Sequence, residues 1–325
     1  MAVRQCKAEE GLAGVQAALD AAGPGDTVEL GPGAYRGDLT LRVGAGVTLA
    51  GTPGAEILYT GWMTAVLVEG AEDVHIRDLI LRADGDPAEA PEELDWDRAL
   101  IRGVEAHGLR VTACVLEGRA ALQNGIMVRR SLQVVLERLR VDAFRRNGIS
   151  ALSAQVRADG NTCSGNGRNG FGIACDPLSP DIESHVELEG NHCHDNDQAG
   201  IALGSSTGTL AENDCWGNKR AGIALRRDPR SPDAPSEAEV RGNRCHYNDH
   251  AGIALFSSTG TLVDNACWGN EFQGIALQRD PRSPDAASEA EIRGNRCHDN
   301  EEGGILLSSS TGTLAENACW GNGED

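Results

Sequence analysis

The sequence predicts an all-β protein built as a parallel β-helix, in which one chain winds into coils whose short strands stack into sheets. The first observation is a repeat, because the unit AGIALGSSTGTLAENDCWGN at 199–218 returns nearly unchanged at 251–270 and 303–322. The second is a fixed rhythm of smaller motifs inside this unit. A repeat this regular indicates one supersecondary unit stacked on itself.

The motif Asn-x-Cys sets the rhythm. Its copies lie alternately 30 and 22 residues apart, and a second asparagine follows each cysteine after three residues. The basic coil is therefore 22 residues long, and alternate coils carry an insertion of eight residues. The motif cysteines are Cys163, Cys193, Cys215, Cys245, Cys267, Cys297 and Cys319.

Each coil contains short apolar alternations, such as Ile201–Leu203, bounded by Gly, Asn, Ser and Thr. A period of two residues indicates strands, and no part of the repeat has helical period or length. Stacked coils lie about 4.8 Å apart. We therefore expect the asparagines to bond to one another along the stack. The cysteines are expected to form one buried, reduced column.

The N-terminal half follows the same plan less regularly. Residues 8–22 form the one helical stretch, which ends at the stop signal Gly-Pro-Gly-Asp. We expect this helix to cover the open end of the first coil, because unpaired strand edges invite aggregation. The sequence thus predicts a capping helix within 1–26 and a β-helix over 27–325, with irregular coils at 27–160 and regular ones at 161–325.

A family resemblance adds to this reading. After the helix, the segments PGDTVELGPGAYRGDLTL and VTLAGTPGAEILY resemble the entry of the pectin-lyase-like right-handed β-helix superfamily. The Gly-Ile and Asn-x-Cys coils resemble the parallel β-helix repeats of its sugar-binding and sugar-hydrolysing branch. The resemblance implies a right-handed helix, but its members include lyases, hydrolases, epimerases and non-enzymatic scaffolds. No catalytic residue carries over, because the Asp-Pro-Arg and Asp-Pro-Leu segments lack the histidine of the epimerase Asp-Pro-His.

Composition narrows the partners. The net charge of −20 argues against nucleic acid and anionic membranes, and no apolar run reaches membrane-spanning length. Met1–Lys7 is polar and no signal-peptide core follows it. Ten cysteines without such a signal indicate a reducing compartment, so we expect a cytoplasmic location. No Cys-x-x-Cys pair indicates a metal site; we expect no cofactor, with Ca²⁺ as the one ion that the carboxylates could hold.

The eight-residue insertions are the first candidate site. They carry the turns Asp-Pro-x-Ser-Pro-Asp at 176–181, 228–233 and 280–285, projecting from the same side of every second coil. Their carboxylates could serve as general acid and base, hold Ca²⁺, or form a repeating binding surface. They could equally cap their own turns and pair with arginine. The candidate residues are Asp228, Arg230, Asp233, Asp280, Arg282 and Asp285.

An aromatic stripe is the second candidate. The residue after each motif cysteine must point outward, because side chains alternate along a strand. From the second motif onward these residues alternate between histidine and tryptophan, and outward tryptophans can stack on sugar rings or enter a partner surface. They could also fold over neighbouring turns with histidine as a spacer. The residues are His194, Trp216, His246, Trp268, His298 and Trp320.

The acidic segment 82–98 is the third candidate, since long loops build the substrate cleft in the superfamily that this chain resembles. It could also be a cation site or a surface loop. We expect a non-catalytic scaffold that binds a protein or a polysaccharide along its lateral face. The alternative is a carbohydrate-active lyase, hydrolase or epimerase with its site near 82–150. The last coil ends at Asp325 without a cap, so we expect further chain or a stacked partner there.

Overall fold

The computed structural model describes residues 1–85, 98–119, 122–179, 182–228, 236–283 and 286–323. It divides into two compact units, 1–157 and 158–325. The described strands belong to three parallel sheets of 13, 12 and 11 strands, here called A, B and C. The prediction of a parallel β-helix is therefore confirmed.

Sheet A contains the first strand of each coil. Its strands are β1 (Val3–Cys6), β2 (Thr27–Leu30), β5 (Thr48–Gly51), β8 (His75–Arg77), β11 (Arg110–Thr112), β14 (Val134–Glu137), β17 (Gln155–Asp159), β20 (His185–Glu189), β23 (Thr207–Ala211), β26 (Glu237–Arg241), β29 (Thr259–Val263), β32 (Glu289–Arg293) and β35 (Thr311–Ala315).

Sheet B follows sheet A within each coil. Its strands are β3 (Gly33–Gly37), β6 (Ala55–Tyr59), β9 (Ile80–Ala83), β12 (Val115–Glu117), β15 (Arg140–Asp142), β18 (Thr162–Ser164), β21 (His192–His194), β24 (Asp214–Trp216), β27 (Arg244–His246), β30 (Ala266–Trp268), β33 (Arg296–His298) and β36 (Ala318–Trp320).

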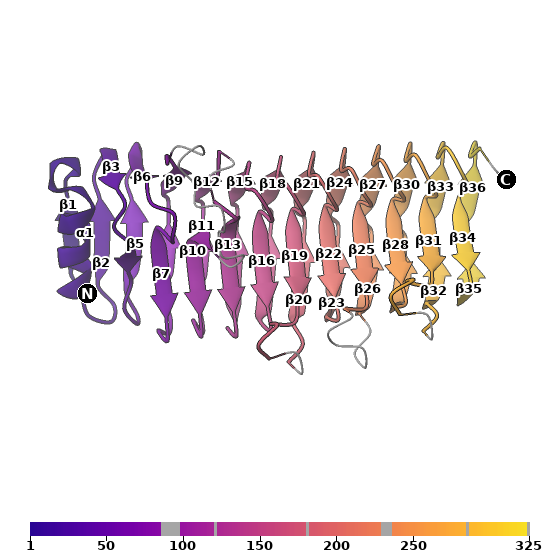
Figure 1. Ribbon diagram of the computed structural model, residues 1–325, viewed down its shortest axis with the longest axis horizontal. Coiled ribbons are helices and arrows are strands. Elements are labelled where there is room, and N and C mark those ends of the chain that lie inside the picture. Colours follow the sequence, from indigo (N-terminus) through magenta and orange to yellow (C-terminus); the bar gives the residue numbers. More distant parts are fainter. Residues whose placement is uncertain (86–97, 120–121, 180–181, 229–235, 284–285, 324–325) are drawn as a thin grey trace. The chain divides into compact units, whose positions relative to one another are not determined.

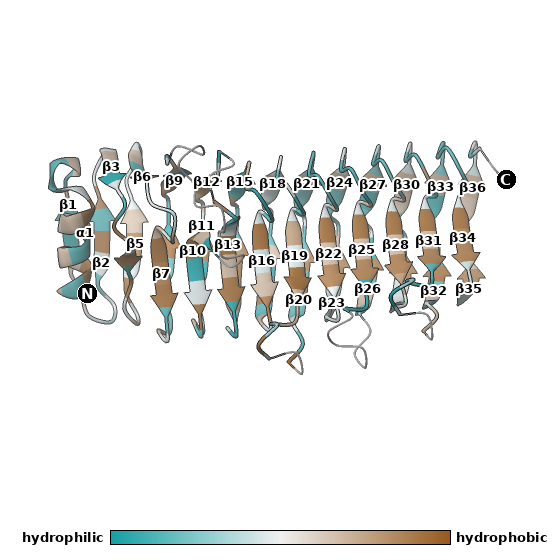
Figure 2. Cartoon of the chain, in the orientation of Figure 1, coloured by the Kyte–Doolittle hydropathy of each residue, from teal (hydrophilic) through white to brown (hydrophobic). Residues whose placement is uncertain are grey.

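Sheet C completes the coil. Its strands are β4 (Leu41–Arg42), β7 (Val66–Glu69), β10 (Ala99–Val104), β13 (Asn124–Arg129), β16 (Ile149–Leu152), β19 (Phe171–Ala174), β22 (Ile201–Gly204), β25 (Ile223–Arg226), β28 (Ile253–Phe256), β31 (Ile275–Gln278) and β34 (Ile305–Ser308). Figure 1 shows the last six of these side by side in sequence order, and Figure 2 shows their apolar composition.

The first unit begins with the expected cap. A 3₁₀ turn, η1 (Ala8–Glu10), leads into α1 (Gly11–Asp20), whose Leu12, Val15 and Leu19 are buried. The helix packs against β1, β2, β3 and β4, so it covers the interior of the first coil. Sequence reasoning missed β1, which precedes the helix and pairs in parallel with β2.

In the second unit, asparagine ladders hold the corners between the sheets, as predicted. At the corner between sheets A and B, Asn213 Nδ2 donates to Asn243 Oδ1 at 2.9 Å and to the Leu188 carbonyl at 2.9 Å. At the corner between sheets B and C, Asn218 Nδ2 donates to Asn248 Oδ1 at 2.9 Å. Each coil thereby satisfies buried amides of its neighbour, which fixes the register of the stack.

The cysteine column lies beside these ladders. Cys193 pairs in register with Cys163 on one side and with Cys215 on the other, and the register continues in the same way to Cys319. All ten cysteines are free thiols. Nine are buried, but Cys319 is exposed, because no described strand stacks on β36. The expectation of a fully buried column is therefore wrong at this last position.

Candidate functional site

The predicted aromatic stripe forms a continuous stack on the outer face of sheet B. His194 and Trp216 stack with their ring centroids 4.3 Å apart, and Trp216 and His246 follow at 5.9 Å. Trp268 then lies between His246 at 4.2 Å and His298 at 5.9 Å, and Trp320 ends the stack 4.5 Å from His298. The interplanar angles are 5–11°. We call these six residues the aromatic column.

The faces of the inner rings are consequently occupied by other rings. Trp216 and Trp268 each have a histidine on both sides, so a sugar can reach their edges but cannot stack on their faces. Trp320 has a stacked neighbour on one side and is 47% exposed. A binding role for the column remains a prediction, and Trp320 offers the most accessible ring.

Carboxylates fix the histidines of the column. Asp214 Oδ1 lies 3.0 Å from His246 Nε2, while Arg244 donates to Asp214 Oδ2 at 2.7 Å. Burial alone would raise the pKa of Asp214, but the hydrogen bond from His246 and the charge of Arg244 lower it overall. His194 and His298 each hold the aspartate that follows them, at 2.7 and 2.8 Å. The aromatic column is therefore held in place by hydrogen bonds and ion pairs, and it is also a candidate binding surface.

The insertion turns lie between sheets C and A, away from the aromatic column. Asp280 is 3% exposed and Asp176 is fully buried, although the sequence places both in projecting turns, where exposed carboxylates are expected. Asp280 Oδ1 accepts a bond from the Arg282 backbone at 2.9 Å, and Oδ2 pairs with the Arg282 side chain at 3.0 Å. These contacts make Asp280 a turn cap. Asp228 is half-buried and its backbone donates to Ser205 Oγ at 2.8 Å. The candidates Arg230, Asp233 and Asp285 lie outside the described residues.

The described charged side chains at and beside the third candidate segment form ion pairs with one another. Arg82 contacts both Glu56 and Glu117, the latter at 2.6 Å. Asp84 contacts Arg36 and Arg119, the latter at 2.8 Å. These pairs form a charge network on the outer face of sheet B in the first unit. Most of the acidic segment, residues 86–97, lies outside the described residues.

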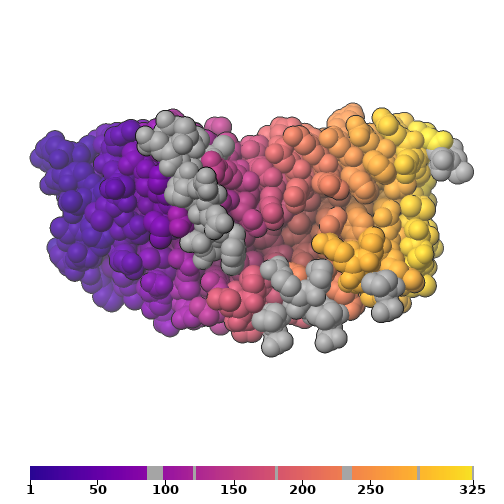
Figure 3. Space-filling view, in the orientation of Figure 1, coloured from indigo at the N-terminus to yellow at the C-terminus, as the bar shows by residue number. Residues whose placement is uncertain are grey.

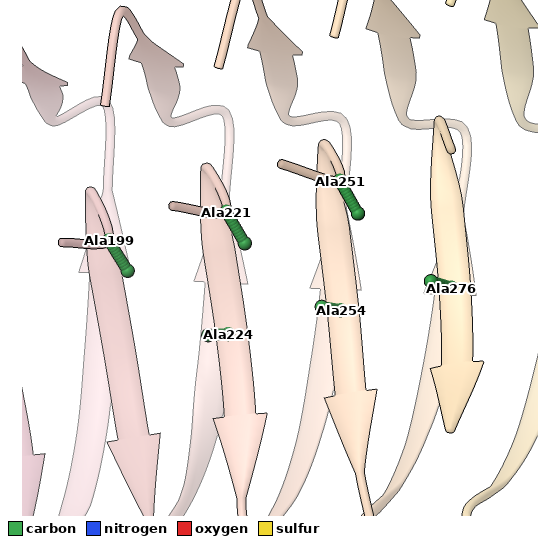
Figure 4. Packing of buried hydrophobic residues seen from close by; sticks show 6 residues of the cluster. All are labelled: Ala199, Ala221, Ala224, Ala251, Ala254 and Ala276. Carbon is green, nitrogen blue, oxygen red and sulfur yellow. The ribbon is translucent and has the colours of Figure 1, made fainter. Parts of the chain in front are cut away.

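Sequence reasoning missed a surface on the outer face of sheet C in the second unit. Ala202, Ala224, Ala254 and Ala276 occupy the outward positions of β22, β25, β28 and β31 and lie in register. Ala254 and Ala276 are fully buried although they point away from the core, and Phe256 packs against this alanine group. Figure 4 shows a second row of alanines, Ala199, Ala221 and Ala251, just before the starts of β22, β25 and β28. Larger side chains therefore lie over a floor of alanines.

Two rows of varied residues flank this floor. Each residue of the first row lies two positions after the second ladder asparagine of its coil. Each residue of the second row is the last residue of a strand of sheet C. Within otherwise repeated coils, these positions change from coil to coil. The first row is Arg168, Gln198, Arg220, His250, Phe272 and Glu302, and the second is Ala174, Gly204, Arg226, Phe256, Gln278 and Ser308.

The middle of these rows concentrates cationic and aromatic groups. The Arg226 guanidinium lies 4.5 Å above the Phe256 ring, and His250 stacks on Phe272 at 4.4 Å. Burial lowers the pKa of Arg226, and the charges of Arg282 and Arg220 add to this effect. Burial also lowers the pKa of His250, followed by the charges of Arg220 and Arg226. We call Arg220, Arg226, His250, Phe256 and Phe272 the alanine-floor site.

The alanine-floor site is accessible and positively charged. Arg220 is exposed, and the other four side chains are half-buried. Figure 3, which views this face, shows a shallow hollow over these strands of the second unit. The lowered pKa keeps His250 neutral near pH 7, so its imidazole can accept a proton. The variation of residues between near-identical coils was the sequence signal that could have located this site.

Among the residues that the structure describes, no group of three or more His, Cys, Asp or Glu side chains is placed to hold a metal ion. Among the helices of the same described residues, none has the length and apolarity to cross a membrane. Binding of Ca²⁺ by the carboxylates stays a prediction.

Comparisons with known proteins agree with the fold. The family model described as right handed beta helix region matches residues 124–281. The A-module of an Azotobacter vinelandii mannuronan C-5 epimerase is 16% identical, with a TM-score of 0.62 over 96% of this chain and 92% of that one. The catalytic unit of an α-1,3-glucanase from Streptomyces thermodiastaticus is 16% identical, with a TM-score of 0.69 over 99% of this chain and 70% of that one.

A surface adhesin of Streptococcus pneumoniae is also similar, at 14% identity and a TM-score of 0.65 over 96% of this chain and 88% of that one. No curated protein matches the chain. The chain therefore has the right-handed parallel β-helix fold. Sequence identities this low support a shared fold but give no evidence of a shared activity.

Proposed function

We propose that this protein binds a carbohydrate chain across the outer face of sheet C in its second unit, at the alanine-floor site. The observation that carries the proposal is the concentration of Arg220, Arg226, His250, Phe256 and Phe272 in the middle coils, where neighbouring coils are otherwise nearly identical. Aromatic rings contact the apolar faces of sugars, and arginine forks bind carboxylates or hydroxyls. The similar proteins include two carbohydrate enzymes, which supports this ligand class.

The cationic groups favour an acidic glycan. Besides burial, the charges of Arg282 and Arg220 both help to lower the pKa of Arg226, and those of Arg220 and Arg226 help to lower the pKa of His250. A protein with a net charge of −20 that keeps Arg220 and Arg226 together on one face has a local surface suited to anions. Neutral oligosaccharides should therefore bind more weakly than uronate-containing ones of equal length.

Calorimetric titration with acidic and neutral oligosaccharides tests the proposal. Replacing Arg226 with alanine removes the guanidinium over Phe256, and we expect affinity to fall by about tenfold or more. Arg293→Ala is the matched control, because Arg293 lies on the outer face of sheet A. Equal affinity for wild type and Arg226→Ala would contradict a site on sheet C.

The same titration separates this surface from the two predicted from the sequence. If the aromatic column binds the glycan, Trp216→Ala, Trp268→Ala and Trp320→Ala should weaken binding in steps. If the insertion turns bind it, changes at Asp228 and Arg282 should do so. Under the proposal, the triple tryptophan variant keeps the affinity of the wild type, provided that its circular dichroism shows an intact fold.

Catalysis at the same surface is the second candidate function. His250 favours it, because a neutral imidazole beside Arg220 and Arg226 can accept a proton from a sugar whose carboxylate the arginines neutralise. Incubation with mannuronan, pectate and α-1,3-glucan should then yield unsaturated, epimerised or shortened chains, and His250→Asn should abolish turnover while binding persists. Binding without turnover of any of these polymers would favour the non-catalytic function.

A further inference from the structure

We propose that Phe256 is a positioning residue of the alanine-floor site, which holds the guanidinium of Arg226 in one orientation for binding an acidic glycan. This inference rests on the proposed function and assigns Phe256 a task within it. The ring acts through the arginine, so its contribution to affinity depends on Arg226 being present. Three features of sheet C lead to it: the register of the row, the open space beside Gly204 and the contacts of the ring.

Register places Phe256 on one side of Arg226 and Gly204 on the other. These residues end the neighbouring strands β22, β25 and β28, so that Gly204 lies opposite Arg226 and Arg226 lies opposite Phe256. Phe256 is the only aromatic residue in this row of strand ends from β19 to β34. The long side chain of Arg226 therefore has a ring to stack on in one direction and no side chain in the other.

The space beside Gly204 is open. A Cβ atom added to Gly204 would meet its nearest atoms outside the adjoining residues, the Ile173 carbonyl oxygen and Ala174 Cβ, at 3.7 and 3.8 Å. Arg226 thus has room on this side, and an arginine side chain loses much rotamer freedom when it is fixed. A contact that selects one direction in advance reduces this loss when a ligand binds.

Phe256 supplies such a contact. The guanidinium carbon of Arg226 lies 4.5 Å from the centroid of the ring, within the range of a cation–π interaction. The ring also packs against the alanine group, in which Ala254 and Ala276 are fully buried. Because alanine reaches only to Cβ, the ring lies close over the sheet and contacts the alanine floor and Arg226 at the same time.

Stacking leaves the binding edge of the guanidinium free. A guanidinium carries its N–H donors in its own plane, so a ring on its face leaves them available for the two oxygens of a carboxylate. The orientation also brings the charge of Arg226 from its own coil to the coil of His250. Burial, followed by the charges of Arg220 and Arg226, lowers the pKa of His250, which agrees with this position.

A double-mutant cycle, measured by calorimetric titration with oligomannuronates and oligogalacturonates, tests the inference. We expect Phe256→Leu to weaken binding about fivefold in the wild-type chain but less than about twofold in the Arg226→Ala variant. Phe256→Tyr and Phe256→Trp should stay within about twofold of wild type, because both keep a ring against the guanidinium. Circular dichroism checks the fold of each variant, and Phe256→Met serves if the leucine variant does not fold.

Phe272→Leu is the matched control, because its ring lies on the same face of sheet C but stacks on His250 at 4.4 Å. Its effect on affinity should be the same with and without Arg226. NMR of the Arg226 side chain gives a second readout that needs no ligand. The Nε–H proton should show an upfield ring-current shift in the wild type, which Phe256→Leu removes and Phe272→Leu leaves in place.

The outcomes separate this inference from the proposed function. If wild type binds but Phe256→Leu has the same effect with and without Arg226, the ring contacts the glycan directly and the inference is overturned. An Arg226 signal that does not move in Phe256→Leu overturns it as well, with glycan binding left standing. Failure of the wild type to bind either oligosaccharide overturns the proposed function itself, and with it the task assigned to Phe256.

Discussion

At the scale of single residues, the ladder asparagines combine three tasks in one side chain. Asn265 donates through Nδ2 to the Val240 carbonyl at 2.8 Å and to Asn295 Oδ1 at 2.9 Å, and its own oxygen accepts from Asn243. It is 1% exposed, so water cannot replace these partners. Buried amides of this kind stabilise the fold chiefly because losing one leaves the others unsatisfied.

Replacing Asn265 with alanine should therefore lower the free energy of unfolding by about 1–3 kcal/mol. The exposed Glu291 on sheet A provides the control, and Glu291→Ala should change it by less than about 0.5 kcal/mol. Urea denaturation followed by circular dichroism measures both. A smaller loss for Asn265→Ala than for Glu291→Ala would refute the role of the ladder.

His250 links folding to pH. Its pKa lies below the ordinary value of about 6.5 because of burial and the charges of Arg220 and Arg226. The unfolded chain then binds the proton more readily than the folded one, so stability falls as pH drops through the unfolded value. His75 contributes in the same direction, since burial and nearby arginines lower its pKa too.

We expect His250→Gln to reduce, without abolishing, the loss of stability between about pH 7 and 5. His185→Gln, which changes an exposed histidine of sheet A, is the matched control. Urea midpoints measured at several pH values give the slopes. An unchanged slope in His250→Gln would show that this imidazole does not titrate as its surroundings imply.

At the scale of elements, the strands of sheet B carry different chemistry on their two faces. In β30, Cys267 points into the core while Trp268 joins the aromatic column outside. One residue of offset thus separates a thiol column from an aromatic one, because side chains alternate along a strand. The short length of these strands leaves little else to stabilise the outer face.

The position of a tryptophan in the aromatic column should determine its contribution. Trp268 has stacked histidines on both sides, whereas Trp320 has one. A stacked pair is worth about 0.5–1.5 kcal/mol beyond area burial, so Trp268→Ala should cost more than Trp320→Ala by a similar amount. Thermal unfolding of the two variants compares them, and equal costs would mean that the second stacked neighbour contributes nothing.

The same elements show what sequence could and could not predict. The asparagine and cysteine positions followed from spacing, because stacking brings residues one coil apart together. The stacking of His246 on Trp268 did not follow, since period-two alternation fixes a side chain's face but not its tilt. The burial of Asp280 was also missed, because its partner Arg282 folds back within a single turn. The residues of the alanine-floor site occupy positions at which the coils differ from one another, so the repeat pattern alone does not predict them.

At the scale of the molecule, stability should be distributed coil by coil. Each coil contacts mainly its neighbours, so a solenoid behaves approximately as a sum of local and nearest-neighbour terms. Among the described coils, the one formed by β34, β35 and β36 has the most exposed strands. We therefore expect this coil to open first in this chain.

The ten thiols can report this order. In native buffer only Cys319 should react quickly with an alkylating reagent, because the other nine are buried. As urea increases, mass-spectrometric mapping should find Cys297 and Cys267 labelled before Cys114 in the first unit, and Asn265→Ala should advance Cys267 while leaving Cys114 unchanged. Local opening predicts this separation, since the ladder bonds lost in the variant join only adjacent coils. Simultaneous labelling of all buried thiols at one urea concentration would instead show that the coils unfold as a single cooperative body.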